Sequence, residues 1–295
     1  MTLVPFDDRD GWIWFDGAFV PWREAKIHVL THGLHYASSV FEGERMYDGT
    51  IFKLREHTER LFKSAEILDF TIPFSLEQID AASIAACAKN GLDDCYVRPI
   101  AWRGSEMIGV SAQESHIHVA IAAWRWPSYF NPQEKAKGIA LTWAKYLRPS
   151  PQTAPTASKA AGLYMICTVS KHAAEREGFA DAMMLDWRGY VAEATGANVF
   201  FVSDGILHTP KPDCFLDGIT RRSVIEIAKG RGFGVIERHI KPEELSGFSE
   251  CFIVGTAAEV TPVAQIAEHR FRPGNVSLSL MEDFSLYARG KLEVV

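Results

Sequence analysis

A break in the local sequence patterns over residues 124–134 most constrains how this chain can fold. Trp126-Pro127-Ser128 and Asn131-Pro132 fit neither a strand nor a helix, because proline lacks the amide hydrogen that both structures use. Alternating strand-like and helix-like stretches lie on both sides of the break. We therefore expect an inter-domain loop at 124–134 between a small α+β domain, 1–123, and a larger domain, 135–295. A chain of 295 residues is long enough for two domains.

Two Asp-Gly pairs predict tight hairpins in the first domain, because such pairs readily adopt positive φ angles. Asp16-Gly17 follows Trp12–Phe15, and Asp48-Gly49 follows Met46-Tyr47. The apolar periodicity then predicts helices and strands in alternation. The expected helices are 55–69 and 76–89, and the expected strands are 95–100 and 116–121.

The larger domain is also expected to consist of strands and helices. A helix is predicted directly after Lys159, ending near Gly178, and a later one ends near Gly230. The other expected elements are strands at 139–143, 181–186, 190–202, 206–209, 233–237 and 251–254, a short helix at 242–245 and a final helix at 278–287.

The charge balance excludes some classes of partner. The 31 lysines and arginines against 37 aspartates and glutamates give a formal net charge of −6 at pH 7. Nucleic acids and anionic membranes are bound through clustered positive charge, so neither is expected as a partner. Apolar runs such as 199–202 are too short to span a bilayer, and the N-terminal residues carry no export pattern. Five scattered cysteines without a CxxC pair are typical of a reduced, cytoplasmic protein.

Two motifs suggest sites that the wider sequence does not support. His28, His32 and His35 have a helical spacing, but no cysteine or carboxylate lies among them to complete a metal site. The glycines of 230–234 end a helix and precede a strand, which is the reverse of the order in a dinucleotide-binding loop. We therefore expect no metal ion and no dinucleotide.

Lys159 is the first candidate catalytic residue. It follows the proline-rich stretch 148–156 and precedes an apolar, aromatic stretch at 160–167. Burial and a position at a helix N-terminus both lower the pKa of a lysine, which Schiff-base chemistry requires. A solvated lysine at a helix start is the alternative that this feature alone leaves open.

Glu193 and a set of anion-binding segments are the other candidates. Few charges surround Glu193, and if buried it needs a partner such as a protonated ring nitrogen. Thr220 is expected to cap a helix whose first amides face an anion, and the turn at 255–258 and Arg60 offer further donors. A solvent-exposed glutamate and caps without a ligand remain the alternatives. A lysine, an acid for a ring nitrogen and a phosphate cradle together describe a site for pyridoxal 5′-phosphate.

Seven strings in one order resemble those of the fold-type IV aminotransferases, closest to the branched-chain amino-acid aminotransferases. The likeness runs from about residue 14 to residue 263. The strings are Tyr36-Ala-Ser-Ser-Val-Phe-Glu-Gly43, Glu56-His-Thr-Glu-Arg-Leu61, Tyr96-Val-Arg-Pro99, Ser158-Lys-Ala160, Glu193-Ala-Thr-Gly-Ala-Asn198, Leu216-Asp-Gly-Ile-Thr-Arg221 and Gly255-Thr-Ala-Ala-Glu-Val-Thr-Pro-Val263. The resemblance implies a two-domain architecture, mixed α+β and α/β, like that of D-amino acid aminotransferase.

The resemblance also implies a role for each matching residue. Lys159 would bind the cofactor covalently and move the substrate proton, and Glu193 would pair with the pyridine nitrogen. The cofactor-binding residues would be Arg60, Lys159, Tyr164, Glu193, Leu216, Gly218, Ile219, Thr220 and Thr256. The substrate-binding residues would be Tyr36, Phe41, Gly43, Tyr96, Arg98, Tyr129, Thr256 and Ala257.

By this resemblance the protein transfers amino groups from leucine, isoleucine or valine to 2-oxoglutarate by a ping-pong mechanism, and is a homodimer or a multiple of dimers. D-amino acid transaminases, (R)-amine transaminases, aminodeoxychorismate lyases and a non-catalytic phosphate-binding relative are the alternatives. The string Arg98-Pro99-Ile100 lacks the histidine of the first of these. Leu163 and Glu44 depart from the usual branched-chain pattern and bear on the substrate preference.

Overall fold

The structure is a computed structural model that describes residues 4–126 and 137–294. The chain divides into two compact units, Met1–Pro127 with Ser158–Gly162, and Ser128–Ala157 with Leu163–Val295. The segment Ser158–Gly162, which contains Lys159, therefore packs with the first unit although the residues on either side of it belong to the second. The domain boundaries expected from the sequence stay a prediction.

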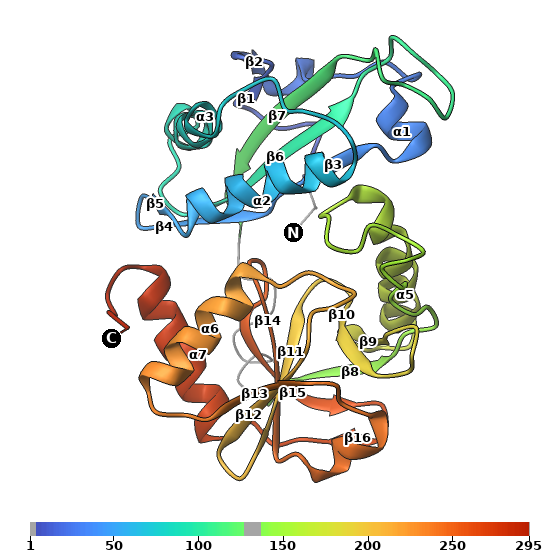
Figure 1. Cartoon of the computed structure of the whole chain (residues 1–295). Helices are drawn as coiled ribbons and strands as arrows, with labels where there is room; N and C mark the ends of the chain where they lie inside the picture. Colours follow the sequence, from blue (N-terminus) through green and yellow to red (C-terminus); the bar gives the residue numbers. More distant parts are fainter. Residues whose placement is uncertain (1–3, 127–136, 295) are drawn as a thin grey trace. The chain divides into compact units, whose positions relative to one another are not determined.

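The first unit contains an antiparallel sheet in the order β2-β1-β7-β6-β4-β5, with β3 paired to β6 (Figure 1). Its strands are β1 (Trp12–Phe15), β2 (Ala18–Pro21), β3 (Ser39–Phe41), β4 (Glu44–Tyr47), β5 (Thr50–Ile51), β6 (Cys95–Arg103) and β7 (Ile117–Trp124). Both predicted Asp-Gly hairpins are confirmed, with φ of +48° and +95° at Asp16 and Gly17 and +48° and +83° at Asp48 and Gly49.

Two helices of the first unit, α2 (Leu54–Ile67) and α3 (Leu76–Lys89), pack on this sheet (Figure 1). They match the predicted helices to within two residues. Ser75 caps α3 in a reciprocal capping box with Gln78. Leu61 and Ile79 are fully buried against sheet residues such as Val97, and such side chains each contribute about 1.5–3 kcal/mol. The unit also contains the short helices η1 (Trp22–Glu24) and α1 (His32–Tyr36).

The second unit is built on a nine-stranded mixed sheet. The strands are β8 (Ile139–Trp143), β9 (Asp181–Leu185), β10 (Val191–Ala194), β11 (Asn198–Ser203), β12 (Ile206–Pro210), β13 (Val235–Arg238), β14 (Glu250–Gly255), β15 (Glu259–Ile266) and β16 (His269–Arg270). Their order is β10-β9-β8-β15-β14-β11-β12-β13, with β16 on β15. Because β10 also pairs with β11, the first six of these strands close into a ring. The closing register pairs Glu193 with Asn198.

Helices cover the outside of this ring (Figure 1). α5 (Met165–Arg176) packs on β8 and β9, α6 (Ile219–Gly230) packs on β14, and α7 (Asn275–Ala288) packs on β14 and β15. The 3-10 helix η3 (Pro242–Gly247) completes the second unit. A further 3-10 helix, η2 (Ala161–Tyr164), begins in the segment that belongs to the first unit and ends in the second.

Three predictions about the elements were wrong or incomplete. The single strand expected at 190–202 is two strands, because the turn at 195–197 reverses the chain. β3, β15, β16, η1 and α1 were not predicted. The helix expected directly after Lys159 is divided into the 3-10 helix η2 from Ala161 and the α-helix α5 from Met165.

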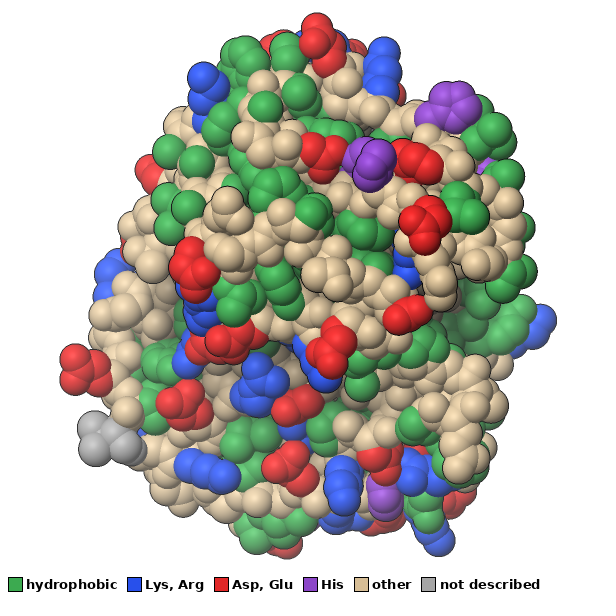
Figure 2. All heavy atoms as spheres, turned by 45° about the horizontal axis from the view of Figure 1, so that its top comes forward, with side chains coloured by type: hydrophobic (Ala, Val, Ile, Leu, Met, Phe, Trp, Pro, Cys, Tyr) green, Lys and Arg blue, Asp and Glu red, His purple; other side chains and the backbone are tan. Residues whose placement is uncertain are grey.

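No helix among the described residues is long and apolar enough to cross a membrane. On the face drawn in Figure 2, acidic and basic side chains are interspersed. This distribution agrees with the small negative net charge of −6.

Candidate functional site

Lys159 lies in an extended segment that pairs with β3 of the first unit. Its backbone amide donates to Oγ of Ser64 at 2.9 Å, and its carbonyl accepts from the amide of Phe41 at 3.2 Å. A β-bridge joins the adjacent Ala160 to Val40. The sequence-based placement of Lys159 at a helix N-terminus is therefore wrong, because these contacts hold its backbone extended. Nζ lies 5.1 Å from the centroid of the Phe41 ring.

Arg98 lies near the same aromatic ring and contacts Tyr96, which in turn lies against Gly43. Nη2 of Arg98 donates to the Tyr96 hydroxyl at 3.2 Å, and the guanidinium carbon is 4.8 Å from the Phe41 centroid. A Cβ added to Gly43 would lie 2.0 Å from the Tyr96 hydroxyl. Only glycine therefore leaves room for this hydroxyl. The first unit thus brings together four residues, Phe41, Gly43, Tyr96 and Arg98, that the sequence predicted for substrate binding.

Arg60 is held by a buried carboxylate that the sequence analysis did not single out. Glu42 accepts from Nε of Arg60 at 2.6 Å and from Nη2 at 2.8 Å, and its Oε2 is 2.7 Å from Nδ1 of His57. Burial opposes the charge of Glu42, but Arg60 and His57 outweigh burial and keep the pKa of its carboxyl below the usual value. Burial lowers the pKa of His57, which favours the neutral ring. The position of Glu42, between Phe41 and Gly43 of the first motif, was the available signal.

Glu44, one of the two departures from the family pattern, is fully buried. Neither carboxylate oxygen receives a hydrogen bond from the described residues. Burial, and then the nearby Glu42 and Asp80, raise the pKa of Glu44 well above its usual value. These surroundings favour the protonated form of this carboxyl.

Glu193 of the second unit is paired with a buried arginine. Oε1 lies 3.3 Å from Nε of Arg148, and Oε2 accepts from Nδ2 of Asn198 at 3.2 Å. The side chains of Glu193 and Arg148 are 12% and 5% exposed. Burial opposes the charge of Arg148, but Glu193 outweighs it and raises the pKa of the guanidinium. The sequence missed Arg148, since nothing in its proline-rich surroundings marks it as a partner of Glu193.

The N-terminus of α6 differs from the expected cap. Gly218, and not Thr220, is the N-cap residue, and no side chain caps the helix. Ile219 and Thr220 are buried in the first turn, where the amides have no partner within the helix. A Cβ at Gly218 would lie 2.2 Å from Oδ1 of Asn198. The side-chain amide of Asn198 in turn donates to the carbonyl of Leu216 at 3.1 Å.

The remaining predicted residues lie in several places. Thr256 and Ala257 are half-buried in the turn between β14 and β15, and Gly255 beside them lies close to the turn at 195–197. Tyr164 is half-buried at the end of η2. Tyr36 is 46% exposed and stacks on His32 at 4.6 Å. Tyr129 lies outside the described residues.

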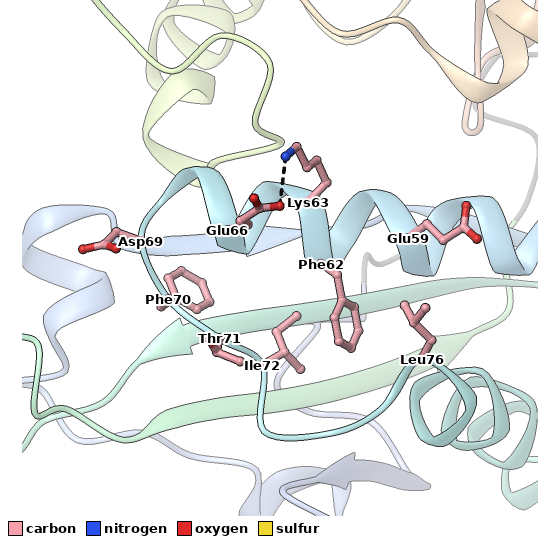
Figure 3. Close-up of a pocket in the computed structure, with 9 residues that line it drawn as sticks. All are labelled: Glu59, Phe62, Lys63, Glu66, Asp69, Phe70, Thr71, Ile72 and Leu76. Carbon is pink, nitrogen blue, oxygen red and sulfur yellow. Dashed lines mark hydrogen bonds and ion pairs between the residues drawn. The ribbon is translucent and has the colours of Figure 1, made fainter.

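Lys159 lines neither of two pockets of the first unit. A groove of about 530 Å³ lies along α2 and the segment after it, with Phe62, Phe70 and Ile72 inside and acidic side chains at its margin (Figure 3). None of its lining residues is a predicted site residue. A pocket of about 320 Å³ on the sheet has mostly apolar walls and includes Arg98.

The histidines of the spacing motif have local partners. The ring nitrogens of His32 lie 2.6 Å from Oγ of Ser38 and 2.7 Å from the carbonyl of Gly109. Nδ1 of His28 accepts from the amide of Leu30. These contacts account for the rings within the fold.

Residues 39–266 match the family model of the class IV amino-transferases, and the chain belongs to this family. The resemblance inferred from the sequence is therefore confirmed, and the protein is an aminotransferase. The branched-chain-amino-acid aminotransferase of Pseudomonas aeruginosa is 41% identical over 293 residues, which cover 97% of this chain and 95% of the relative.

Solved structures agree with this relationship over the whole fold. The Escherichia coli branched-chain amino acid aminotransferase matches with a TM-score of 0.93 and 36% identity, covering 97% of both chains. The T.th. branched-chain amino acid aminotransferase complexed with N-(5′-phosphopyridoxyl)-L-glutamate matches with a TM-score of 0.91 and 38% identity, covering 96% of both chains. The predicted fold-type IV architecture is thus confirmed.

Proposed function

We propose that this protein is a pyridoxal 5′-phosphate-dependent transaminase that transfers the amino group of leucine, isoleucine or valine to 2-oxoglutarate by a ping-pong mechanism. The observation that carries the proposal is the fixed backbone of Lys159, bonded on both sides to Ser64 and Phe41, in a chain with branched-chain aminotransferase relatives. A lysine amine is the group that such chemistry requires.

The residues present fit the phosphate and the ring of this cofactor. The uncapped first turn of α6 provides backbone amides and the positive end of a helix dipole, which suit a phosphate. Glycine at position 218 is required by the close approach of Asn198, so the backbone remains uncovered there. The ionised Glu193 suits a protonated ring nitrogen, and Arg60 adds a guanidinium for the phosphate.

In our proposal the cofactor and the residues around it have separate roles. When bound, the cofactor supplies a protonated pyridine ring that draws electrons from the substrate Cα. Nζ of Lys159 carries the proton from the substrate Cα, and Glu193 holds the proton on the ring nitrogen. The phosphate is bound by Arg60, Ile219, Thr220 and Thr256, the phenolic oxygen by Tyr164, and the ring face by Leu216 at the loop that includes Gly218.

The substrate is bound by residues of opposite character. The turn at Thr256-Ala257 and the Tyr96 hydroxyl orient the α-carboxylate, and Arg98 receives the distal carboxylate of glutamate. Phe41 and Tyr36 form apolar walls, and Gly43 leaves the space for Tyr96. The adjacency of the Arg98 guanidinium to the Phe41 ring supports a site that accepts both apolar and acidic side chains.

A coupled assay with leucine, isoleucine and valine against 2-oxoglutarate tests the substrate class. Consumption of D-alanine or an arylalkylamine much faster than leucine would assign a different member of the fold type. Borohydride reduction after addition of the cofactor is expected to label Lys159, and Lys159→Ala is expected to lose both label and turnover. Lys63→Ala, which removes an exposed lysine of α2, is the control. A protein that develops no visible absorption with the cofactor and takes no label would be a non-catalytic relative.

We also propose a cytoplasmic homodimer, or a multiple of dimers. Large apolar side chains are exposed on the first unit, among them Val29 at 70%, Leu34 at 62% and Val110 at 91%. Exposed apolar groups of this size are typical of surfaces that a second chain covers. Light scattering on Leu34→Asp and Val110→Asp, with Lys63→Ala as control, is expected to show a loss of dimer only in the first two. An unchanged mass in both would exclude this surface from the interface.

A further inference from the structure

The Glu193 carboxylate is surrounded by protein groups on both of its oxygens. Asn198 lies directly opposite Glu193 at the point where β10 and β11 close the ring of strands. Its Nδ2 donates to Oε2 of Glu193 at 3.2 Å and to the carbonyl of Leu216 at 3.1 Å. One amide therefore joins the acid to the loop that leads into α6.

The position of this amide is fixed from its other side. Its Oδ1 would lie 2.2 Å from a Cβ at residue 218, so Gly218 packs directly against it. Asn198 is itself buried, at 6% exposure. The amide cannot rotate away without displacing the loop at 216–218.

The other oxygen of Glu193 faces Arg148. The Arg148 backbone amide donates to the carbonyl of Leu185 at 2.8 Å, and a β-bridge joins Arg148 to Asp186. Nη1 donates to Sγ of Cys167 at 3.4 Å. The backbone and the guanidinium of Arg148 are therefore both held in place, and the side chain is only 5% exposed.

A buried carboxylate takes up a proton unless a cation or hydrogen bonds stabilise its charge. A neutral Glu193 would lose the negative charge that stabilises a protonated ring nitrogen, and one of its oxygens would become a donor. The Arg148 cation lies at one oxygen of Glu193, and the Asn198 amide donates a hydrogen bond to the other.

We propose that Arg148 and Asn198 are positioning residues that keep Glu193 ionised and correctly oriented for the ring nitrogen of the cofactor. The inference rests on the proposed function, because it assumes that Glu193 contacts that ring. Arg148 acts by its charge, and Asn198 acts by tying the carboxylate to the Leu216 carbonyl.

The test measures binding of pyridoxal 5′-phosphate to the full-length apoprotein, together with the pH dependence of the visible absorption of the bound cofactor. Arg148→Met is expected to weaken binding about tenfold or more, the size that loss of a charged partner produces. It is also expected to shift the pH midpoint of the absorption. Arg148→Lys, which keeps the charge, is expected to recover part of both effects.

A double-mutant cycle separates this role from a structural one. In a Glu193→Gln background Arg148→Met is expected to change the dissociation constant less than about twofold, since no carboxylate remains to be stabilised. Arg231→Met is the control, because Arg231 also pairs with a buried acid of the second unit, Asp283. An equal effect of Arg148→Met in both backgrounds, with an unchanged pH midpoint, would overturn the proposal.

A substitution of Asn198 tests the proposal without changing the charge of any residue. Asn198→Ser is expected to weaken binding severalfold in the wild-type background and to have little effect in the Glu193→Gln background. If Arg148→Met does not fold, the Asn198→Ser and Arg148→Lys cycles decide the question alone, and additive effects in them would contradict it. A wild-type protein that fails to bind the cofactor would instead refute the proposed function.

Discussion

Glu42 binds Arg60 through both carboxylate oxygens, with distances of 2.6 Å to Nε and 2.8 Å to Nη2. The acid is fully buried, whereas the arginine side chain is 16% exposed. The pair therefore fixes the direction of a guanidinium whose end remains accessible. This geometry supports the proposed contact of Arg60 with a phosphate.

Glu42→Gln is expected to destabilise the fold by about 3–5 kcal/mol, because it leaves a mostly buried guanidinium without its counter-charge. Urea unfolding of the two apoproteins measures the effect. Glu66→Gln, which breaks the exposed pair with Lys63 on the same helix, is the control and should cost less than about 1 kcal/mol. Equal losses in the two variants would show that Glu42 does not stabilise Arg60.

Glu44 predicts a pH dependence of the free energy of unfolding. Its folded pKa is raised, so above the unfolded value of 4.5 the unfolded chain loses a proton that the native protein keeps. Its contribution is therefore full below pH 4.5 and falls as the pH rises toward the folded pKa, by at most about 1.4 kcal/mol per pH unit. Glu44→Gln removes this pH-dependent loss of stability, because glutamine does not ionise.

Relative to wild type, Glu44→Gln should therefore gain more than about 1 kcal/mol between about pH 5 and pH 8. Urea unfolding at the two pH values measures this gain, and Glu66→Gln should show none. A difference between wild type and Glu44→Gln that does not change with pH would mean that Glu44 is ionised in the native protein.

Gly43→Ala is expected to raise the KM for the amino acid by about tenfold to a hundredfold, because the new Cβ displaces the Tyr96 hydroxyl. Steady-state kinetics with leucine measures the change. Gly247→Ala, at a glycine with no atom within 4 Å of the added Cβ, should leave the KM unaltered. A wild-type KM in Gly43→Ala would exclude Tyr96 from substrate binding.

The thiols are expected to be unreactive in the native protein. All five cysteines are free and buried, and burial raises the pKa of Cys167 to about 11 and of Cys214 to about 12. Little thiolate of Cys167 and Cys214 is therefore present at about pH 8, and burial keeps a reagent away from the other three thiols. A colorimetric disulfide reagent should titrate none of the five thiols in buffer and all five in denaturant. Rapid reaction of one thiol in buffer would show an accessible site.

Local chemistry explains which elements were predictable. The Asp-Gly turns and the amphipathic pattern of α2 depend on residues close in sequence, so they could be predicted without the fold. β3 is short and pairs with β6, which lies far along the chain. β15 follows its partner β14 directly, but Pro262 within it disguises the strand pattern. The predicted position of Lys159 at a helix N-terminus was wrong because its backbone is held by Ser64 and Phe41, which lie in a distant part of the sequence.

The residues of the candidate site also fall into those that the sequence predicts and those that only the fold reveals. The sequence by itself determined the family and the identity of the reactive groups, Lys159, Glu193 and Arg60, because motifs preserve residue types and their order. Only the tertiary structure decided what surrounds these groups: Glu42 against Arg60, and Arg148 and Asn198 against Glu193. Burial and charge pairing depend on distances in space, and the strands that bring Arg148 to Glu193 are assembled only when the chain folds.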